Sequence, residues 1–208
     1  LTVIDPRRSE TAGIADAHHF IRPGSDPALL AALLLALDEA GLMNPGRLAP
    51  MLEGWDEAWA ALRQFTITDL ARACGWEVAA IHALAAELGN GLPTAVYGRI
   101  GVSTAPFGTL AHWLINLLNI ATGNLDREGG VMFSSPAVDV AGSSGPGSRG
   151  RFFSRVSSHP EVMGEFPAVS LAEEIATPGE GQIKALVVIA GNPVLSVPDG
   201  GALDAALD

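Results

Sequence analysis

Cysteine and basic residues are scarce in this sequence of 208 residues. Cys74 is the only cysteine, which excludes an internal disulfide and a multi-cysteine zinc or iron–sulfur site built from this chain alone. Lys and Arg number 12 against 23 Asp and Glu, which gives a formal charge of −11. Because nucleic-acid binding requires a basic surface, this composition argues against a nucleic-acid partner, and any anion site must be local.

Long apolar runs are also missing. The most apolar stretch, residues 27–37, is shorter than the roughly 18 residues that a membrane span needs, and it is followed by Asp38 and Glu39. We therefore expect no membrane span, and we see no secretory signal at the start. The chain begins with Leu1 rather than Met. We interpret it as an incomplete fragment of a larger enzyme, whose location stays open with a cytoplasmic one favoured.

The rest of the composition is typical of an α/β protein. Hydrophobic residues make up 48% of the chain, which is enough for one or two packed domains. Alternation of strands with helices indicates a mostly parallel, Rossmann-like sheet with helices on both faces. The predicted strands are 1–4, 19–21, 94–97 and 183–189, and helical patterns cover 9–17, 27–40, 44–88, 107–122 and 202–207.

A long segment rich in Gly, Ser and Pro interrupts this alternation. It contains Arg149, Arg151 and Arg155, and a connection of this length is either functional or disordered. We therefore divide the chain into an α/β segment (1–128), a long functional loop region (129–180), and a strand and helix that begin the next α/β unit (181–208).

The first candidate site follows the first predicted strand. An acidic residue such as Asp5, at the carboxyl end of a buried strand, can accept hydrogen bonds from ribose hydroxyls. Arg7 or Arg8 can pair with phosphate. A plain turn at Asp5 and Pro6 with exposed arginines explains the same residues.

The second candidate site precedes the helix predicted from Pro27. Asp26 can serve as the cap of this helix. Alternatively, its carboxylate can accept from N1–H and the 2-amino group of guanine, a pair of donors that adenine does not offer. Both interpretations stay open.

Two glycine-containing turns follow predicted strands. In the loop 98–104, glycines allow backbone N–H groups to approach a ligand, and the following helix favours an anion. Their spacing does not fit the dinucleotide fingerprint. Gly191-Asn192-Pro193 follows the strand at 183–189, where ligands of open α/β sheets bind, although an ordinary turn is the alternative. The histidines show no metal-ligand spacing.

Taken in order, these segments resemble the molybdopterin oxidoreductases of the dimethyl sulfoxide reductase type, with the nearest likeness to formate-dehydrogenase-like members. Order and spacing fit over nearly the whole chain, and least well at 134–178. The resemblance is carried by residues 3–8, 15–16, 21–26, 97–99, 118–119, 122–126, 129–130 and 191–193.

The resemblance implies a bis-molybdopterin guanine dinucleotide cofactor with Mo or W in the parent enzyme. One dinucleotide would contact residues 5–9 with its guanosine and phosphates, and residues 24–26 with its guanine. Relatives such as periplasmic nitrate reductase show Met and Gln where Ile100 and Thr104 stand at pterin-side positions, which puts their role in doubt. The implied cofactor-binding residues are Asp5, Pro6, Arg7, Arg8, Ser9, Gly24, Ser25, Asp26, Ile100, Gly101, Thr104, Gly191 and Asn192.

The resemblance also implies what this chain lacks. Family members place their 4Fe-4S cysteines and their metal ligand upstream, outside this chain. The loop 134–155 corresponds to a substrate funnel, so Arg149 or Arg151 could orient a small oxyanion or formate-like substrate; no residue is assigned as catalytic or as a metal ligand. We expect the isolated chain to be inactive and to work with the remainder of the parent chain and an electron-transfer subunit.

Two other interpretations stay open. The chain could be a cofactor-free structural domain, as in the large subunit of respiratory NADH dehydrogenase, or an independent nucleotide-binding module. The presence of Asp5, Arg7 and Asp26 favours the cofactor-binding enzyme, because a domain released from binding could lose them.

Overall fold

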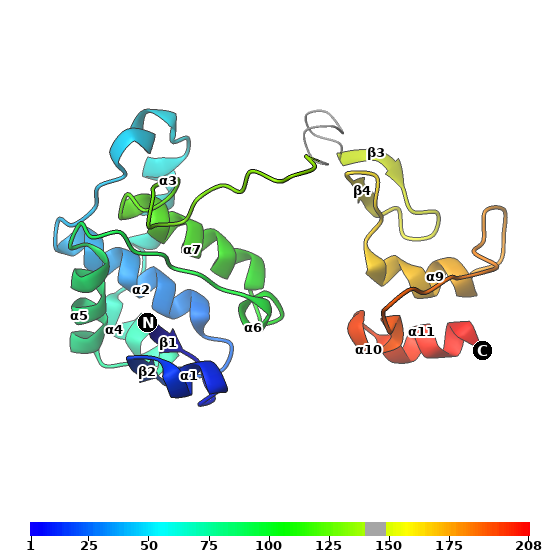
Figure 1. Ribbon diagram of the computed structural model, residues 1–208, viewed down its shortest axis with the longest axis horizontal. Helices are drawn as coiled ribbons and strands as arrows, with labels where there is room; N and C mark the ends of the chain where they lie inside the picture. Colours follow the sequence, from blue (N-terminus) through cyan, green and yellow to red (C-terminus); the bar gives the residue numbers. More distant parts are fainter. Residues whose placement is uncertain (140–148) are drawn as a thin grey trace. The chain divides into compact units, whose positions relative to one another are not determined.

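The computed structural model describes residues 1–139 and 149–208. They fall into two compact units, unit 1 (Leu1–Ser134) and unit 2 (Ser135–Asp208), which Figure 1 shows. Residues 140–148 of the predicted loop region lie outside the described part. The functional division predicted at 128 and 180 stays a prediction.

Unit 1 is built mainly of helices, together with one short two-stranded sheet. None of the helices in the described ranges is both long and apolar enough to cross a bilayer. The elements of unit 1 are β1 (Thr2–Ile4), α1 (Glu10–Ile14), β2 (Ala17–His19), α2 (Asp26–Glu39), a 3-10 helix (Gly46–Met51), α3 (Trp55–Leu62), α4 (Ile67–Cys74), α5 (Val78–Leu88), α6 (Ile100–Ser103) and α7 (Gly108–Ala121).

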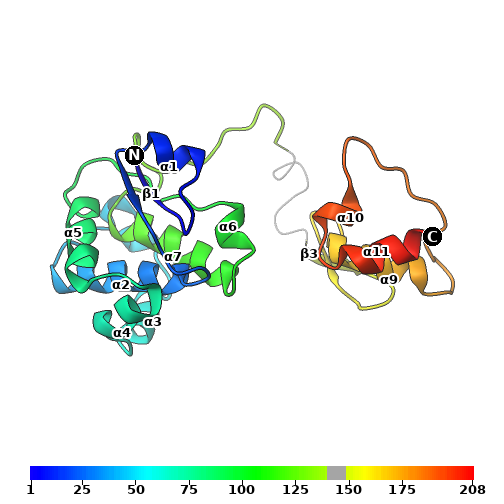
Figure 2. The same ribbon diagram turned by 90° about the horizontal axis from the view of Figure 1, so that it is seen from below.

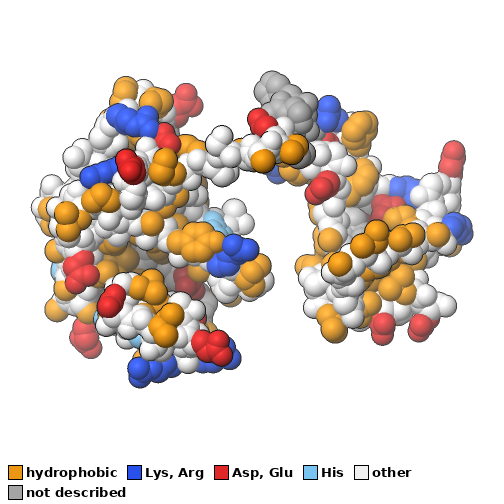
Figure 3. Space-filling model, viewed as in Figure 1, with side chains coloured by type: hydrophobic (Ala, Val, Ile, Leu, Met, Phe, Trp, Pro, Cys, Tyr) orange, Lys and Arg blue, Asp and Glu red, His pale blue; other side chains and the backbone are white. Residues whose placement is uncertain are grey.

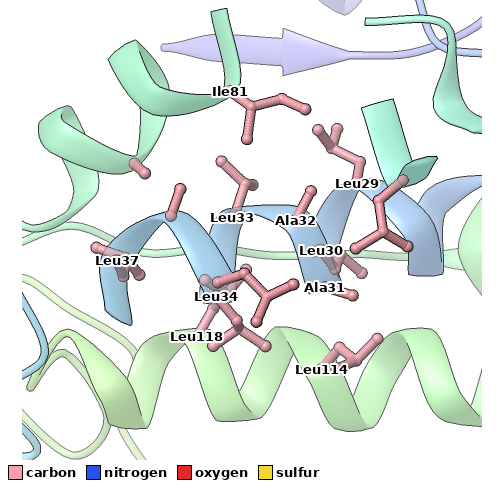
Figure 4. Packing of buried hydrophobic residues seen from close by; sticks show 14 of the residues in the cluster. Leu29, Leu30, Ala31, Ala32, Leu33, Leu34, Leu37, Ile81, Leu114 and Leu118 are labelled. Atoms are coloured by element: carbon pink, nitrogen blue, oxygen red, sulfur yellow. The ribbon is translucent and has the colours of Figure 1, made fainter. Parts of the chain in front are cut away.

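Helix α2 forms the centre of unit 1. It packs against α4, α5 and α7, and Figure 2 shows it among these helices. All residues from 29 to 37 are buried, as expected for a helix that is apolar on every face. In Figure 4, Ile81 of α5 lies on one side of α2, and Leu114 and Leu118 of α7 lie on the other. This core holds the beginning of α2 in a defined place.

Strand β1 pairs with β2 in parallel, with Thr2 opposite Ala17 and Ile4 opposite His19. The second strand therefore lies two residues before its predicted position. Beyond the ladder, the Asp5 amide donates to the His19 carbonyl at 3.2 Å. Asp5 consequently stands directly after the end of β1, as predicted.

Residues 94–97 do not form the predicted strand. Instead, the Asn119 side chain bonds both backbone groups of Val96, and Asn124 Oδ1 accepts from the Thr94 amide at 3.1 Å. The extended segment is thus paired with side chains of the α7 region, which satisfy backbone groups that a neighbouring strand would otherwise bind.

Unit 2 contains an antiparallel strand pair and short helices. Helices α9 and α11 pack together, with Leu203 fully buried. The elements are β3 (Arg149–Phe153), β4 (Pro160–Val162), a 3-10 helix (Ala168–Ser170), α9 (Leu171–Ala176), α10 (Pro193–Ser196) and α11 (Gly200–Leu207).

The predicted buried strand at 183–189 is wrong for the described residues. Val187 and Ile189 are 84% and 86% exposed, and the segment belongs to neither sheet. A β-branched run suits a pleated, half-buried surface, but it becomes a strand only where another strand lies beside it. The hydrophobic side chains of this and other segments reach the surface in both units, as Figure 3 shows.

The α/β class is confirmed, but one mostly parallel sheet is not seen. Within the described ranges there are two two-stranded sheets, one parallel and one antiparallel. The expected Rossmann-like sheet with helices on both faces is therefore not formed by these residues, because the segments 94–97 and 183–189 have no strand partner among them.

Candidate functional site

Unit 1 contains a pocket of about 690 Å³ where the end of β1, the start of α2 and the α6 region meet. This volume lies in the range of small-molecule sites. We call it the α2 pocket. Its lining residues are Ile4, Asp5, Pro6, Pro23, Gly24, Asp26, Tyr97, Gly98, Arg99, Gly101, Val102, Thr104, Ala105 and Pro106. Three segments that are distant in the sequence therefore form one concave site.

The β1 wall is fixed by hydrogen bonds around Asp5. Its carboxylate Oδ1 accepts from the Arg7 amide at 2.7 Å, and its carbonyl accepts from His18 Nε2 at 3.1 Å. The predicted Asp-Pro turn is therefore present. Among the described residues, no hydrogen bond engages the second carboxylate oxygen of Asp5, so this oxygen is available to a ligand.

The α2 wall is anchored through Arg22. Its guanidinium donates to the carbonyls of Arg72 (3.0 Å) and Ala73 (2.7 Å) at the end of α4, where a cation is favoured by the helix dipole. Gly24 follows with φ of 75°, and a Cβ at this position would approach Pro106 Cδ to 3.2 Å. A residue with a side chain would be strained there, so this wall requires glycine.

Asp26 is the first residue of α2 and does not cap it. Ser25 occupies the capping position, but its side chain makes no capping hydrogen bond to the helix. Its hydroxyl instead donates to the Arg22 carbonyl at 2.6 Å. No hydrogen bond or ion pair of the Asp26 carboxylate occurs in the described part of the chain. The expectation that Asp26 caps the helix is thus wrong, and its carboxylate lines the pocket without a protein partner.

The α6 wall is packed tightly against α7. A Cβ at Gly98 would lie 2.5 Å from Ile115 Cδ1, and one at Gly108 would lie 2.4 Å from the Ser103 carbonyl oxygen. Ser103 Oγ donates to the Arg99 carbonyl (3.2 Å) and shares a 2.8 Å hydrogen bond with His112 Nε2. These contacts fix the backbone of the loop that carries Gly101 and Thr104.

Arg99 and Tyr97 line the pocket although neither was assigned a role from the sequence. Arg99 Nη1 donates to the Tyr97 hydroxyl at 2.9 Å, and this hydrogen bond raises the pKa of Arg99. The sequence signal that could have identified Arg99 is a single cation within the glycine-containing loop after an extended segment.

Six of the predicted site residues are brought together by the fold, and several others lie elsewhere. Asp5, Pro6, Gly24, Asp26, Gly101 and Thr104 line the pocket. Arg7, Arg8, Ser25 and Ile100 do not, and Arg7, Arg8 and Ile100 are exposed. Ser9 Oγ caps α1 by accepting from the Ala12 amide at 3.3 Å, so its hydroxyl already has a structural role.

The remaining predicted residues lie in unit 2. Arg149 is exposed at the start of β3. Arg151 Nε lies 3.6 Å from Oε1 of Glu161, a carboxylate whose side chain is 1% exposed. Gly191 is exposed, and the Asn192 side chain caps α10 by accepting from the Leu195 amide at 3.3 Å. The Asn192 side chain thus has a structural role in this turn, and its contact with the cofactor stays a prediction.

No group of three or more His, Cys, Asp and Glu that could hold a metal ion occurs in the described ranges. The charged side chains of the α2 pocket are suited to polar organic groups: the carboxylates accept hydrogen bonds, and Arg99 donates them.

The chain is similar to segments of several known oxidoreductases. No family model matches the chain. It is 34% identical over 125 residues to an assimilatory nitrate reductase of Haloferax mediterranei, covering 60% of this chain and 17% of that protein. It is 26% identical to a nitrate reductase of Klebsiella oxytoca, and 26% identical to an F420-dependent formate dehydrogenase subunit alpha of Methanocaldococcus jannaschii. Both matches cover 100% of this chain, and they cover 25% and 32% of those proteins.

A solved structure shows the same fold over part of the chain. Acetylene hydratase from Pelobacter acetylenicus matches with a TM-score of 0.54 at 20% sequence identity, covering 59% of this chain and 17% of that chain. The chain is thus homologous to a segment of the molybdopterin oxidoreductases of the dimethyl sulfoxide reductase type, which confirms the resemblance. It spans between 17% and 32% of the length of these curated relatives.

Proposed function

We propose that unit 1 supplies part of the binding site for one molybdopterin guanine dinucleotide in a Mo- or W-dependent oxidoreductase. The observation that carries this proposal is the convergence of Asp5, Asp26 and the Gly101 loop on one pocket. These residues come from three separate sequence segments that resemble the family at matching positions.

The free acceptors of the pocket fit a guanosine. The unengaged oxygen of Asp5 can accept from a ribose hydroxyl, and the carboxylate of Asp26 can accept from N1–H and the 2-amino group of guanine. Gly24 lines the pocket beside Asp26 with backbone atoms alone. When bound, the cofactor supplies the two-electron redox chemistry, while the protein holds and orients it.

The finer features of the parent enzyme belong to the same proposal. It would carry two such dinucleotides, with Gly191 and Asn192 near the second, and a 4Fe-4S cluster outside this chain. A formate-dehydrogenase-like activity on formate or a small oxyanion fits the relatives named above. Arg149 is the better candidate for an anionic substrate, because the Arg151 guanidinium lies beside Glu161. The remainder of the parent chain and an electron-transfer subunit would complete the enzyme.

The test is the cofactor content of the complete protein that contains this chain, purified from a host that makes the cofactor. Mass spectrometry would measure bound Mo and W, and acid hydrolysis would release GMP. We expect about one metal and two GMP per chain. Absence of both would overturn the proposal and favour the cofactor-free structural domain, as in the large subunit of respiratory NADH dehydrogenase.

A further inference from the structure

The charged residues that line the α2 pocket suit the ribose and base of a nucleotide better than its phosphates. The charged residues in the lining are Asp5, Asp26 and Arg99. The carboxylates can accept hydrogen bonds from a ribose and a base, but they repel a phosphate group. A nucleotide bound here therefore needs a cation for its phosphates, and the position of that cation determines how the nucleotide is oriented.

The other nearby arginines are poorly placed for this role. The guanidinium of Arg22 is engaged with two backbone carbonyls at the end of α4. Arg7 and Arg8 follow Asp5 in the sequence, but both are exposed and neither belongs to the pocket lining. The phosphate contact suggested for Arg7 or Arg8 by the sequence is therefore not supported by their position.

Arg99 has the features that a phosphate contact requires. It belongs to the pocket lining, and it makes no ion pair with a carboxylate among the described residues. One Nη1–H donates to the Tyr97 hydroxyl at 2.9 Å, which leaves other N–H groups of the planar guanidinium for a ligand. The hydrogen bond of the Arg99 carbonyl with Ser103 Oγ (3.2 Å) and the Ser103–His112 contact hold its backbone.

We propose that Arg99 binds the phosphates of the nucleotide whose ribose and guanine lie against Asp5 and Asp26, with Tyr97 orienting the guanidinium. This assignment rests on the proposed function of the pocket. Tyr97 acts on the phosphate only through Arg99, so it is a positioning residue. A guanidinium is well suited to the role, because it pairs with two phosphate oxygens at once and stays charged at all working pH values.

The experiment measures binding of GDP and of guanosine, which lacks phosphate, to the apo form of the complete protein by isothermal titration calorimetry. In the wild-type protein we expect GDP to bind more tightly than guanosine. Arg99→Gln should weaken GDP binding about ten- to a hundredfold, the size expected for a charge-assisted hydrogen bond, and leave guanosine binding unchanged. Tyr97→Phe should give a smaller loss, again for GDP only.

Two arginine variants separate this assignment from a general charge effect. Arg72→Gln removes a charge outside the lining, where the side chain is 75% exposed, and should change neither affinity. The double variant Arg7→Gln/Arg8→Gln tests the contact suggested by the sequence. Thermal unfolding, measured independently of ligand binding, reports whether each variant has folded. Should Arg99→Gln not fold, Arg99→Lys replaces it, with a smaller expected loss confined to GDP.

Three results would overturn the proposal. Equal losses of GDP and guanosine binding in Arg99→Gln would mean that Arg99 only shapes the pocket. A GDP-specific loss in the Arg7/Arg8 variant, with none in Arg99→Gln, would place the phosphates at those residues. Failure of the wild-type protein to bind either compound would reject the proposed function itself, and this result is distinguishable because it requires no substitution.

Discussion

The side chain of Asn119 takes the place of a neighbouring strand beside Val96. Its Oδ1 accepts from the Val96 amide at 2.9 Å, and its Nδ2 donates to the Val96 carbonyl at 2.8 Å. Nδ2 also donates to the Ile115 carbonyl at 2.9 Å. The amide is 1% exposed and uses both its donors and its acceptor. It thus ties the extended segment that leads into the α6 wall to helix α7.

Asn119→Ala is expected to lower the free energy of unfolding by about 1–3 kcal/mol, because the partly buried backbone groups of Val96 lose their partners. Urea denaturation would measure the loss. Asn116→Ala is the matched control, since Asn116 is an exposed residue of the same helix. Equal stability of the two variants would show that the Asn119 bonds to Val96 contribute nothing.

Asp26→Asn in the complete protein should reduce the amount of guanine nucleotide that the protein retains. The NH2 group of the new amide cannot accept a hydrogen bond from N1–H or the 2-amino group of guanine. Loss of a pair of hydrogen bonds to a charged acceptor corresponds to a fall in affinity of about ten- to a hundredfold. GMP released after dialysis would be measured. Asp56→Asn, an exposed carboxylate in the first turn of α3, serves as the control, and unchanged retention in Asp26→Asn would exclude a guanine contact.

Gly108→Ala should destabilise unit 1 and loosen the α6 wall. The added Cβ would lie 2.4 Å from the Ser103 carbonyl oxygen and 2.7 Å from that of Val102, so the loop backbone must move. We expect a loss of about 1–3 kcal/mol, as for other overpacked sites, measurable by thermal unfolding. Gly13→Ala in α1, where nothing lies within 4 Å, should be neutral or stabilising. A neutral Gly108→Ala would contradict the tight contact.

Cys74 should make stability fall at alkaline pH. Burial raises the pKa of its thiol, so the folded protein keeps the proton at a pH where the unfolded chain has lost it. The contribution to stability is complete below the unfolded pKa of about 8.5 and is lost as the pH rises toward the folded value. Between pH 7.5 and 10, the urea concentration at the midpoint of unfolding should fall more steeply for the wild-type protein than for Cys74→Ala. An equal dependence of the two midpoints on pH would contradict the prediction.

Several elements were predictable because their cause is local. Helix α4 ends at Cys74 because Gly75 adopts the left-handed conformation with φ of 80°, which glycine favours after the end of a helix. Helix α7 likewise lies within the helical pattern predicted at 107–122. These features depend on which residues adjoin in the chain, so a single sequence is sufficient to recognise them.

Other elements were not predictable because their partners are distant. The apolar, β-branched patterns at 94–97 and 183–189 predict strands, yet neither has a strand partner in the described part of the chain. An extended run looks the same whether its backbone is paired by another strand, by asparagine side chains or by neither. The pattern identifies the conformation of the segment, but it does not identify what lies beside it.

The sequence by itself determined the central helix α2, whose apolar residues on every face require burial, and the identity of the acceptors Asp5 and Asp26. Only the tertiary structure decided which candidate residues meet. It brought Asp5, Asp26 and Arg99 to one pocket and left Arg7 and Arg8 outside it. The reason is physical: composition and spacing set what a side chain can bind, whereas its direction depends on a backbone path that long-range packing determines.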